Sequence, residues 1–279
     1  MNRTEIITAL RRQLESGSPV IGVCAGIGLT AKCAEKAGVD LVFVNNAGRF
    51  RASGRSTLLS KFSFGNANET MLQMAGEILP VIDRTPAIAG VFAQDPFRDI
   101  ELLLEHLQRL GFAGIQNSPS LGMMKPAMAK NLEAGMLGFS KEVAMIAKAH
   151  EMGFLTAPLA HQPEQAAQFA AVGADIVVAT VGITVGEEDP APTPDLEQNI
   201  RDLEAMAQAA KETSPNALVL CHGGALSSPE AVQRVLDAVP AIDGFVGGSA
   251  IERIPVEKAI ARIIHEFKNA ARPQEVDTL

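Results

Sequence analysis

The sequence predicts an α/β fold, a (β/α)₈ barrel with an extra helix at its N-terminus. Short apolar runs alternate with amphipathic helical segments along nearly the whole chain of 279 residues, and eight such runs are present. The runs are apolar at both odd and even positions, as expected for a parallel sheet that is buried on both faces. Eight repeats in a chain of this length favour a closed barrel over an open sheet. We expect a single domain over residues 1–279.

The first expected element is a helix over residues 3–15, in which Ile6, Leu10 and Leu14 recur at helical spacing. The eight apolar runs, each predicted to be a strand, are 20–25, 39–44, 87–92, 112–115, 154–158, 175–179, 217–221 and 243–246. The helices expected between them are 29–37, 67–79, 97–110, 140–150, 163–172 and 227–239.

Glycine marks the ends of four of these helices. Gly38, Gly111, Gly153 and Gly173 each stand just before the next apolar run, as turns from helix to strand prefer. Two connections are longer than usual, 45–68 after the second run and 181–195 after the sixth. Long loops on the rim of a barrel often form lids or set specificity, so we expect these two segments to border the site.

Composition excludes several classes of partner. The net charge is −8 and no basic tract offsets it, which argues against nucleic acid and against acidic membranes. No apolar run is long enough to span a bilayer, and the first fifteen residues lack the apolar stretch of a secretion signal. Three widely spaced cysteines, Cys24, Cys33 and Cys221, do not form a disulfide framework. We therefore expect a cytoplasmic protein.

Two glycine-rich turns follow the last two apolar runs and suggest an anion site. Gly223 and Gly224 follow the seventh run, and Gly247, Gly248 and Ser249 follow the eighth. Glycine lets backbone N–H groups approach a ligand closely, and the loops after strands seven and eight are the usual phosphate site of such barrels. The alternative is that these glycines only permit tight turns.

The long loop after the second run carries three arginines, Arg49, Arg51 and Arg55. In an acidic protein such a cluster suits a carboxylate or a phosphate, because guanidinium groups pair with planar oxyanions. A solvated lid surface that pairs with local acids is the alternative. No lysine stands in any of the eight runs, which disfavours a Schiff-base mechanism. Lys125 in the fourth loop is the nearest candidate for such a lysine and is more simply an anion ligand.

Several polar residues follow the predicted strands directly, where barrel enzymes place their chemistry. His222 could act as an acid or base, or it could be a histidine satisfied by the core. Asp95 could bind a metal, act as a base, or cap the next helix. Asn46 and Asn117 could orient a substrate through hydrogen bonds.

Ordered sequence blocks along the chain together resemble the phosphoenolpyruvate hydrolase-like family, also described as a TIM-barrel signal-transduction domain. The blocks are 25-AGIGLTAK-32, 45-NNAGRFRASGRSTL-58, 64-FGNAN-68, 89-AGVFAQDPF-97, 111-GFAGIQNSP-119, 220-LCHGG-224 and 246-VGGSAIERIPVE-257. The resemblance implies a barrel like those of phosphoenolpyruvate mutase and isocitrate lyase, in which Mg²⁺ holds a 2-oxo acid. It also implies a homo-oligomer.

We therefore expect a hydrolase or lyase that acts on a small phosphorylated or 2-oxo carboxylic acid, such as phosphoenolpyruvate or phosphonopyruvate. The loops after strands seven and eight would hold one anionic group, and Arg49 and Arg51 would clamp the other. Mg²⁺ is the cofactor that the resemblance implies, and Asp95 is its one candidate ligand. The alternatives are a barrel that senses a small molecule without turnover, and a barrel that binds a flavin phosphate.

Overall fold

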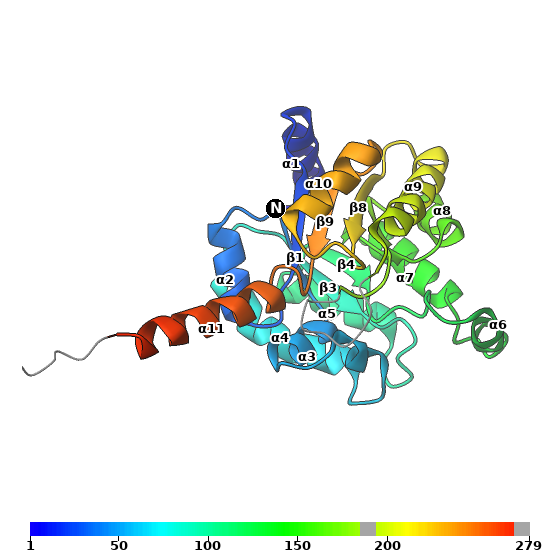
Figure 1. Ribbon diagram of the computed structural model, residues 1–279. Coiled ribbons are helices and arrows are strands. Elements are labelled where there is room, and N and C mark those ends of the chain that lie inside the picture. Colours follow the sequence, from blue (N-terminus) through cyan, green and yellow to red (C-terminus); the bar gives the residue numbers. More distant parts are fainter. Residues whose placement is uncertain (185–193, 271–279) are drawn as a thin grey trace, which may run out of the picture.

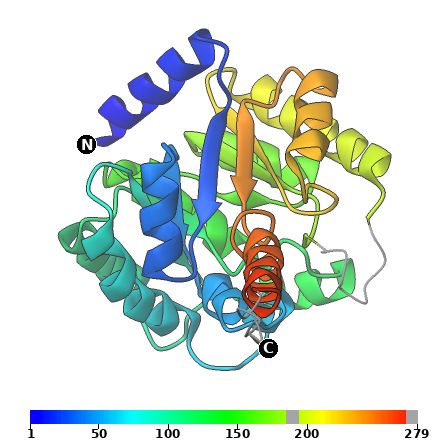
Figure 2. The same ribbon diagram turned by 60° about the vertical axis from the view of Figure 1, so that its left-hand side comes forward.

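The computed structural model describes residues 1–184 and 194–270, in which parallel strands and helices alternate (Figure 1). The strands are β1 (Val20–Cys24), β2 (Leu41–Val44), β3 (Ala87–Val91), β4 (Gly114–Asn117), β5 (Leu155–Thr156), β6 (Leu159–Ala160), β7 (Ile176–Thr180), β8 (Leu218–His222) and β9 (Gly244–Gly247). Their order in the sheet is β5-β4-β3-β2-β1-β9-β8-β7-β6, and every pair is parallel. Figure 2 shows β1 and β9, the first and last strands, side by side.

The two ends of this order belong to one extended segment. β5 pairs with β4, and β6 pairs with β7, with only Ala157 and Pro158 between the two short strands. Ala157 N–H still donates to the carbonyl of Ile115 at 2.9 Å, and the carbonyl of Pro158 accepts from Val178 N–H at 2.8 Å. Residues 155–160 therefore join both ends of the curled sheet, and the predicted (β/α)₈ barrel is confirmed. The fifth predicted strand continues two residues beyond Pro158.

Most of the helices cover the outside of the sheet. The helices within the described residues are α1 (Arg3–Glu15), α2 (Gly28–Lys36), α3 (Asn46–Ala52), α4 (Ala67–Ile78), α5 (Ile100–Leu110), α6 (Pro126–Ala134), α7 (Ser140–Glu151), α8 (Pro163–Ala171), α9 (Leu196–Thr213), α10 (Pro229–Ala238) and α11 (Arg253–Lys268), with short 3₁₀ helices η1 (Thr57–Lys61) and η2 (Leu79–Val81). The four glycines predicted to close helices all have positive φ, between 83° and 96°. These left-handed positions end each helix and start the turn into the next strand.

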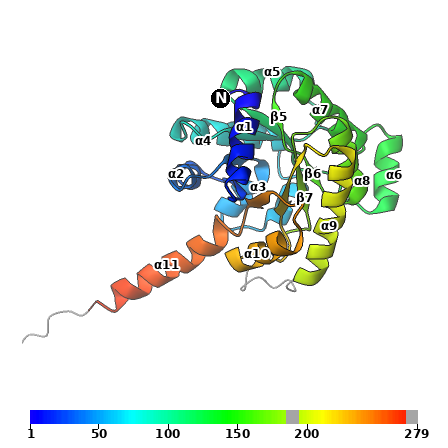
Figure 3. The ribbon, with the colours of Figure 1, turned by 90° about the horizontal axis from the view of Figure 1, so that it is seen from above.

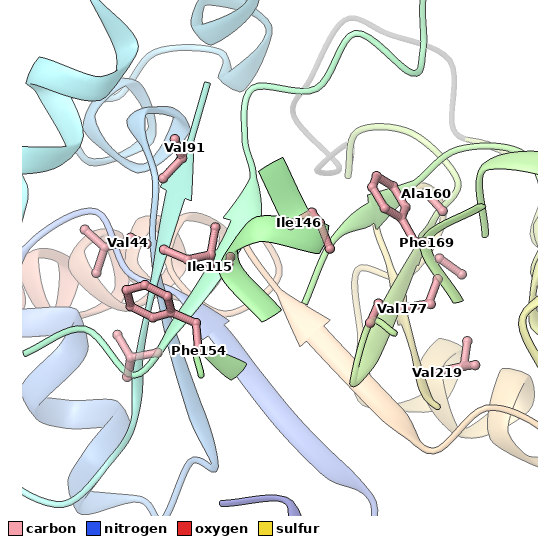
Figure 4. Close-up of a cluster of buried hydrophobic side chains, with 14 of the residues drawn as sticks. Val44, Val91, Ile115, Ile146, Phe154, Ala160, Phe169, Val177 and Val219 are labelled. Carbon is pink, nitrogen blue, oxygen red and sulfur yellow. The ribbon is translucent and has the colours of Figure 1, made fainter. Parts of the chain in front are cut away.

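Alternate strand residues face opposite sides of the barrel wall. Leu41 and Phe43 of β2 belong to the cluster that fills the barrel, whereas Val42 and Val44 belong to the cluster between strands and helices. Figure 4 shows part of this outer cluster, where Ile146 of α7 lies over the sheet. Each fully buried side chain of this size contributes roughly 1.5–3 kcal/mol, so the two clusters hold the strands, and with them the residues that follow each strand.

Helix α1 closes one end of the barrel. Asn2 and Glu5 form a reciprocal capping box at its start, and Ile6 and Leu10 pack on the inner cluster. The residues predicted for this helix are confirmed. The predicted loop 45–68 is wrong in part, because it contains α3 and η1. α3 has only seven residues, too few for a periodic pattern to stand out.

Helix α11 leaves the barrel and extends away from it (Figures 1 and 3). None of its residues is buried. Part of the second long loop, residues 185–193, lies outside the described residues. Because residues 185–193 and 271–279 lie outside the described residues, the single domain over residues 1–279 stays a prediction.

Candidate functional site

A cavity of about 90 Å³ lies at the ends of the strands where the chain leaves the sheet. This is the end at which barrel enzymes build their active sites. Polar residues from seven strands or the segments after them line it: Cys24, Asn45, Arg51, Lys61, Gln116, His161, Thr180, His222 and Ser249. Among the described residues that line the cavity, four carry cationic or titratable nitrogen groups and none is a carboxylate.

Arg51 lies on α3, the short helix that begins directly after β2. Its guanidinium Nε donates to Glu252 Oε2 at 2.8 Å, and Nη2 donates to the carbonyl of Cys24. Both side chains of the Arg51–Glu252 pair are buried, with 4% and 6% exposed. A Cβ at Gly248 would lie 3.3 Å from Nη1 of Arg51, so the third nitrogen faces the open space beside Gly248.

Two glycines allow α3 to come this close to the first strand. A Cβ at Gly26 would lie 2.3 Å from the carbonyl oxygen of Gly48, so a side chain at Gly26 would push α3 away. The N–H of Gly26 also donates to Glu252 Oε1 at 2.6 Å. The loop after β1, helix α3 and the start of α11 thus fix one guanidinium together.

His222 is the last residue of β8 and lies next to Arg51 and Gly248 at the cavity wall. Its Nδ1 is 2.7 Å from the carbonyl oxygen of Val246, so Nδ1 carries the proton in the neutral ring and Nε2 is an acceptor. Burial lowers the pKa of His222. The hydrogen bond to Val246 opposes that shift, and the charge of Arg51 adds to it. A neutral imidazole at this place can accept a proton.

His161 and Lys61 face the same cavity from the opposite loops. Nε2 of His161 is buried and has no hydrogen-bond partner among the described residues. Burial, with the nearby charge of Lys61, lowers the pKa of His161 to about 3. Lys61 ends η1, and burial lowers the pKa of its ammonium group while the charge of Glu142 opposes that shift. Lys61 makes no hydrogen bond or ion pair with any residue that the structure describes.

Three of the predicted site residues do not line the cavity. Asn46 donates to the carbonyl of Ser60 at 3.1 Å and so ties α3 to η1. Asn117 donates to the carbonyl of Leu159 at 3.2 Å and accepts from its N–H at 2.6 Å, which joins β4 to β6. Asp95 and Asn46 line a neighbouring pocket. Their catalytic roles stay predictions.

Asp95 has partners on both carboxylate oxygens. Asn66 and Asn68 donate to Oδ2 at 2.8 and 3.0 Å, and the N–H of Phe97 donates to Oδ1 at 3.0 Å. Arg98 lies 3.8 Å away as a further ion-pair partner. The carboxylate therefore holds the turn after β3 together.

Only some of the predicted anion ligands line the cavity. Arg51, Gly248 and Ser249 line the cavity. Arg49 points away from it and forms an ion pair with Glu77 at 2.8 Å. A Cβ at Gly223 would lie 2.0 Å from the carbonyl oxygen of Gly182, and one at Gly224 would lie 2.2 Å from Asn199 Oδ1. Close packing therefore accounts for Gly223 and Gly224. Gly247 lies against Phe245 and Ile251.

Lys61 is not among the site residues that the sequence predicts. Lys61 stands in a long loop without a periodic pattern, and Lys125 in the fourth loop was favoured instead. Lys125 is exposed and does not line the cavity. Only the three-dimensional course of η1 brings Lys61 beside His161.

The sequence matches the phosphoenolpyruvate hydrolase-like family over residues 5–270. The chain belongs to this family. It is 43% identical over 268 residues to the ToMV resistance protein Tm-1(GCR237) of Solanum lycopersicum, a match that covers 96% of this chain and 36% of that protein. The chain thus spans little more than a third of the length of the curated relatives that it matches first.

Solved structures share the fold at low sequence identity. Phosphoenolpyruvate phosphomutase from Streptomyces platensis subsp. rosaceus superposes with a TM-score of 0.59 at 13% identity, covering 94% of this chain and 86% of that one. A phosphonopyruvate hydrolase in complex with oxalate and Mg²⁺ superposes with a TM-score of 0.57 at 16% identity, covering 98% of this chain and 90% of that one. At these identities the likeness establishes the barrel alone.

Proposed function

We propose that this chain is a hydrolase or lyase that acts on a small phosphorylated or 2-oxo carboxylic acid in the cavity at the strand ends. The observation that carries the proposal is the lining of that cavity, with Arg51, Lys61, His161 and His222 around one small space and no carboxylate among the described lining residues. Membership of the phosphoenolpyruvate hydrolase-like family supports the same class of reaction. The substrate would supply the negative charge that the cavity lacks.

Each lining residue has a role in this proposal. Nη1 of Arg51 binds an acidic group of the substrate in the space beside Gly248, and Ser249 adds a hydroxyl donor there. Asn45 and Gln116 orient the substrate from the other wall. Oδ1 of Asn45 is buried without a hydrogen-bond partner among the described residues, so a donor of the ligand can satisfy it.

His222 would move the proton. In a hydrolysis that releases pyruvate, water adds to the phosphoryl group, phosphate leaves, and the electron pair of the broken C–P bond of phosphonopyruvate, or O–P bond of phosphoenolpyruvate, remains on the enolate of pyruvate. Nε2 of His222 takes a proton from the attacking water and then returns one to the enolate carbon. Arg51 and Lys61 stabilise the negative charge that develops on the enolate oxygen.

The other predicted residues would act through these groups. Asn46 holds η1 and therefore Lys61, Asn117 holds the segment before His161, and Asp95 holds the turn after β3. In this proposal they position the cavity wall and do not contact the substrate.

Magnesium is the cofactor that the resemblance implies, and the described donors do not fit it. Mg²⁺ takes oxygen ligands in near-octahedral geometry, usually one or two carboxylates together with waters and oxygens of the substrate, and no carboxylate is among the described residues that line the cavity. No group of three or more histidine, cysteine or acidic residues that could hold a metal ion occurs within residues 1–184 and 194–270. Both oxygens of Asp95 already accept hydrogen bonds. We therefore derive no step through a metal ion.

Turnover tests this function. Phosphonopyruvate and phosphoenolpyruvate are incubated with the protein, and pyruvate is followed by coupled oxidation of NADH. We expect pyruvate from at least one of them, and His222→Ala should lower kcat/KM by about 10²- to 10⁴-fold because the proton acceptor is lost. His106→Ala, which alters an exposed histidine on α5, is the matched control. Tight binding of these acids without any product would support the sensor instead.

We also propose that the protein is a homo-oligomer that covers α11. Val256, Ile260, Ile263 and Phe267 recur along one face of this helix, and their exposed fractions lie between 44% and 76%. The helix after the last strand of a barrel normally packs on the sheet, and an apolar face left in water needs a partner. A second copy presents the same surface and can form a closed symmetric contact.

Light scattering after size exclusion tests this assembly. The double variant Ile260→Asp, Ile263→Asp should shift the protein to the mass of a monomer, because two charges would enter the apolar contact. Ala261→Asp adds a charge on the opposite side of α11 and should leave the mass unchanged. A native protein that already has the mass of a monomer would contradict the proposal.

Localisation and the absence of macromolecular ligands stay predictions. Within the described residues, no helix is long and apolar enough to cross a membrane.

A further inference from the structure

Among the described residues, the two carboxylates nearest the cavity are both engaged by protein donors. Glu252 accepts from Gly26 N–H on Oε1 and from Arg51 on Oε2. Glu142 accepts from Leu121 N–H and from the amide of Gln94 on Oε1, and from Asn117 on Oε2. A carboxylate whose lone pairs are already used is a poor ligand for a hard cation.

The nitrogen groups around the cavity are less completely paired than these carboxylates. Of the four around the cavity, Arg51 has a buried acid as its partner. Lys61 has no hydrogen bond or ion pair within the described part of the chain, and Nε2 of His161 is buried without a partner there. Unpartnered polar atoms in a buried site cost free energy unless a ligand satisfies them.

Two separate anchor points lie across this small space. Nη1 of Arg51 and the ring of His222 lie 3.3 and 3.8 Å from the point where a Cβ of Gly248 would be, so the missing side chain leaves room for an oxyanion. Lys61 and His161 reach the cavity from η1 and from the segment after β6. A ligand with one acidic group at each anchor would satisfy both.

We infer that the cavity is a metal-free dianion site, in which the ammonium group of Lys61 neutralises the second acidic group of the ligand. This inference rests on the proposed acid-binding function and deepens it. It assigns to Lys61 the charge that Mg²⁺ would otherwise supply, and it places the first acidic group on Arg51 beside Gly248. The ligand class is a short dicarboxylate, or a carboxylate that carries a phosphonate or phosphate.

Binding should then draw protons into the cavity. The titratable groups that face Lys61 are His161, His222 and, from α7, Glu142. Burial lowers the pKa of Lys61, and burial with the neighbouring cations lowers the pKa of both histidines. A bound dianion whose second acidic group lies beside Lys61 and His161 favours the charged form of His161. Ligand binding at neutral pH should therefore take up protons.

Titration calorimetry with oxalate tests the inference without any turnover. Oxalate is titrated into the whole chain in EDTA and in millimolar Mg²⁺, each in two buffers of different ionisation enthalpy. We expect the same Kd in EDTA and Mg²⁺ within about twofold, with net proton uptake. Lys61→Met should weaken binding about 10- to 100-fold, as expected for a charge-assisted contact.

Two further variants make the result specific. Lys61→Arg keeps the charge and should restore most of the affinity, which a merely structural role of the side chain would not explain. Lys125→Met removes an exposed lysine that does not line the cavity, and it should bind oxalate as the native chain does. Circular dichroism confirms that each variant is folded.

Several outcomes would overturn the inference. Binding that requires Mg²⁺ and is lost in EDTA would do so, as would a Lys61→Met variant with native affinity, or no oxalate binding under either condition. Pyruvate formation that depends on Mg²⁺ would preserve the proposed function and reject the metal-free site. Metal-free oxalate binding without turnover of any acid would preserve the site and reject the proposed enzyme.

Discussion

Two buried polar clusters lie at the same end of the barrel and differ in one respect. Around Glu142, the carboxylate accepts from Leu121 N–H at 2.7 Å, from Gln94 at 3.2 Å and from Asn117. Around the cavity, Lys61 and Nε2 of His161 have no partner among the described residues. The carboxylate of Glu142 has all its hydrogen-bond donors within the protein, whereas Lys61 and Nε2 of His161 find no hydrogen-bond partner among the described residues.

The difference teaches which buried polar groups serve the fold and which await a ligand. Burial raises the pKa of Glu142, and the hydrogen bonds from Leu121 and Asn117 partly offset that shift. Its negative charge is thus held by dipoles that the fold provides. For Lys61, the described residues provide no hydrogen bond or ion pair, and only the charge of Glu142 opposes the lowering of its pKa, so a ligand has to complete the compensation. Substitutions in the two clusters should therefore separate stability from binding.

The largest effect on stability is expected for Glu142→Ala. The change leaves the N–H of Leu121 and the amides of Gln94 and Asn117 without their acceptor, and each unsatisfied buried donor costs about 1–3 kcal/mol. We expect a loss of about 3 kcal/mol, read as a lower midpoint in urea at constant slope. The oxalate affinity of the folded protein should fall far less than in Lys61→Met.

Glu101→Ala is the control for this variant. Glu101 lies on the surface of α5 and pairs with Lys148 at 3.1 Å, and exposed pairs of this kind contribute at most about 1 kcal/mol. If Glu142→Ala and Glu101→Ala were equally stable, the hydrogen bonds of Glu142 would not stabilise the fold more than an exposed ion pair does, which would contradict the prediction.

Most of the fold could be predicted from the sequence because it depends on patterns that repeat. Every predicted apolar run overlaps a strand, and the positive φ of Gly38 and Gly111 agrees with their predicted places after helices. β6 was missed because Pro158 interrupts the apolar run, although its carbonyl still pairs with β7. α3 was missed because its seven residues carry no readable period.

The site was less predictable because it depends on contacts between distant segments. His222, Arg51 and Ser249 could be proposed from their places near strand ends. Nothing in the sequence separates Lys61 from Lys125, and Glu142 stands at an ordinary position in an amphipathic helix. Whether a polar residue is satisfied depends on partners far along the chain, and one sequence does not show these partners.

Gly248→Ala should have a smaller effect, and on binding only. The added methyl group would lie 3.3 Å from Nη1 of Arg51, where the first acidic group of the ligand is expected. Gly248 does not have the positive φ that would strain an alanine. We expect oxalate affinity to fall about tenfold, or about 1.4 kcal/mol, at unchanged stability.

Gly76→Ala is the matched control, because a Cβ at this position on α4 meets nothing within 4 Å. It should bind oxalate normally and gain about 0.5–1 kcal/mol of stability from its helical position. Native oxalate affinity in Gly248→Ala would show that the ligand does not lie beside Arg51. Lys61 and His161 would then be the only cavity groups in this comparison that bind the ligand.

The smallest effect concerns Glu35, a satisfied carboxylate away from the cavity. Hydrogen bonds from the N–H groups of Thr85, Arg84 and Asp83 lower the pKa of Glu35 to about 2. A folded-state pKa below the unfolded value contributes stability above roughly pH 4.3, which is lost as the pH falls toward 2. Glu35→Gln should thus lower the Tm slightly at pH 7, and the difference should shrink between pH 4 and 2. Since this carboxylate serves only the fold, the oxalate affinity of Glu35→Gln at pH 7 should equal that of the native chain. If the affinity fell as much as in Lys61→Met, substitution of a satisfied group would affect binding as well as stability, and the distinction between the two kinds of group would fail.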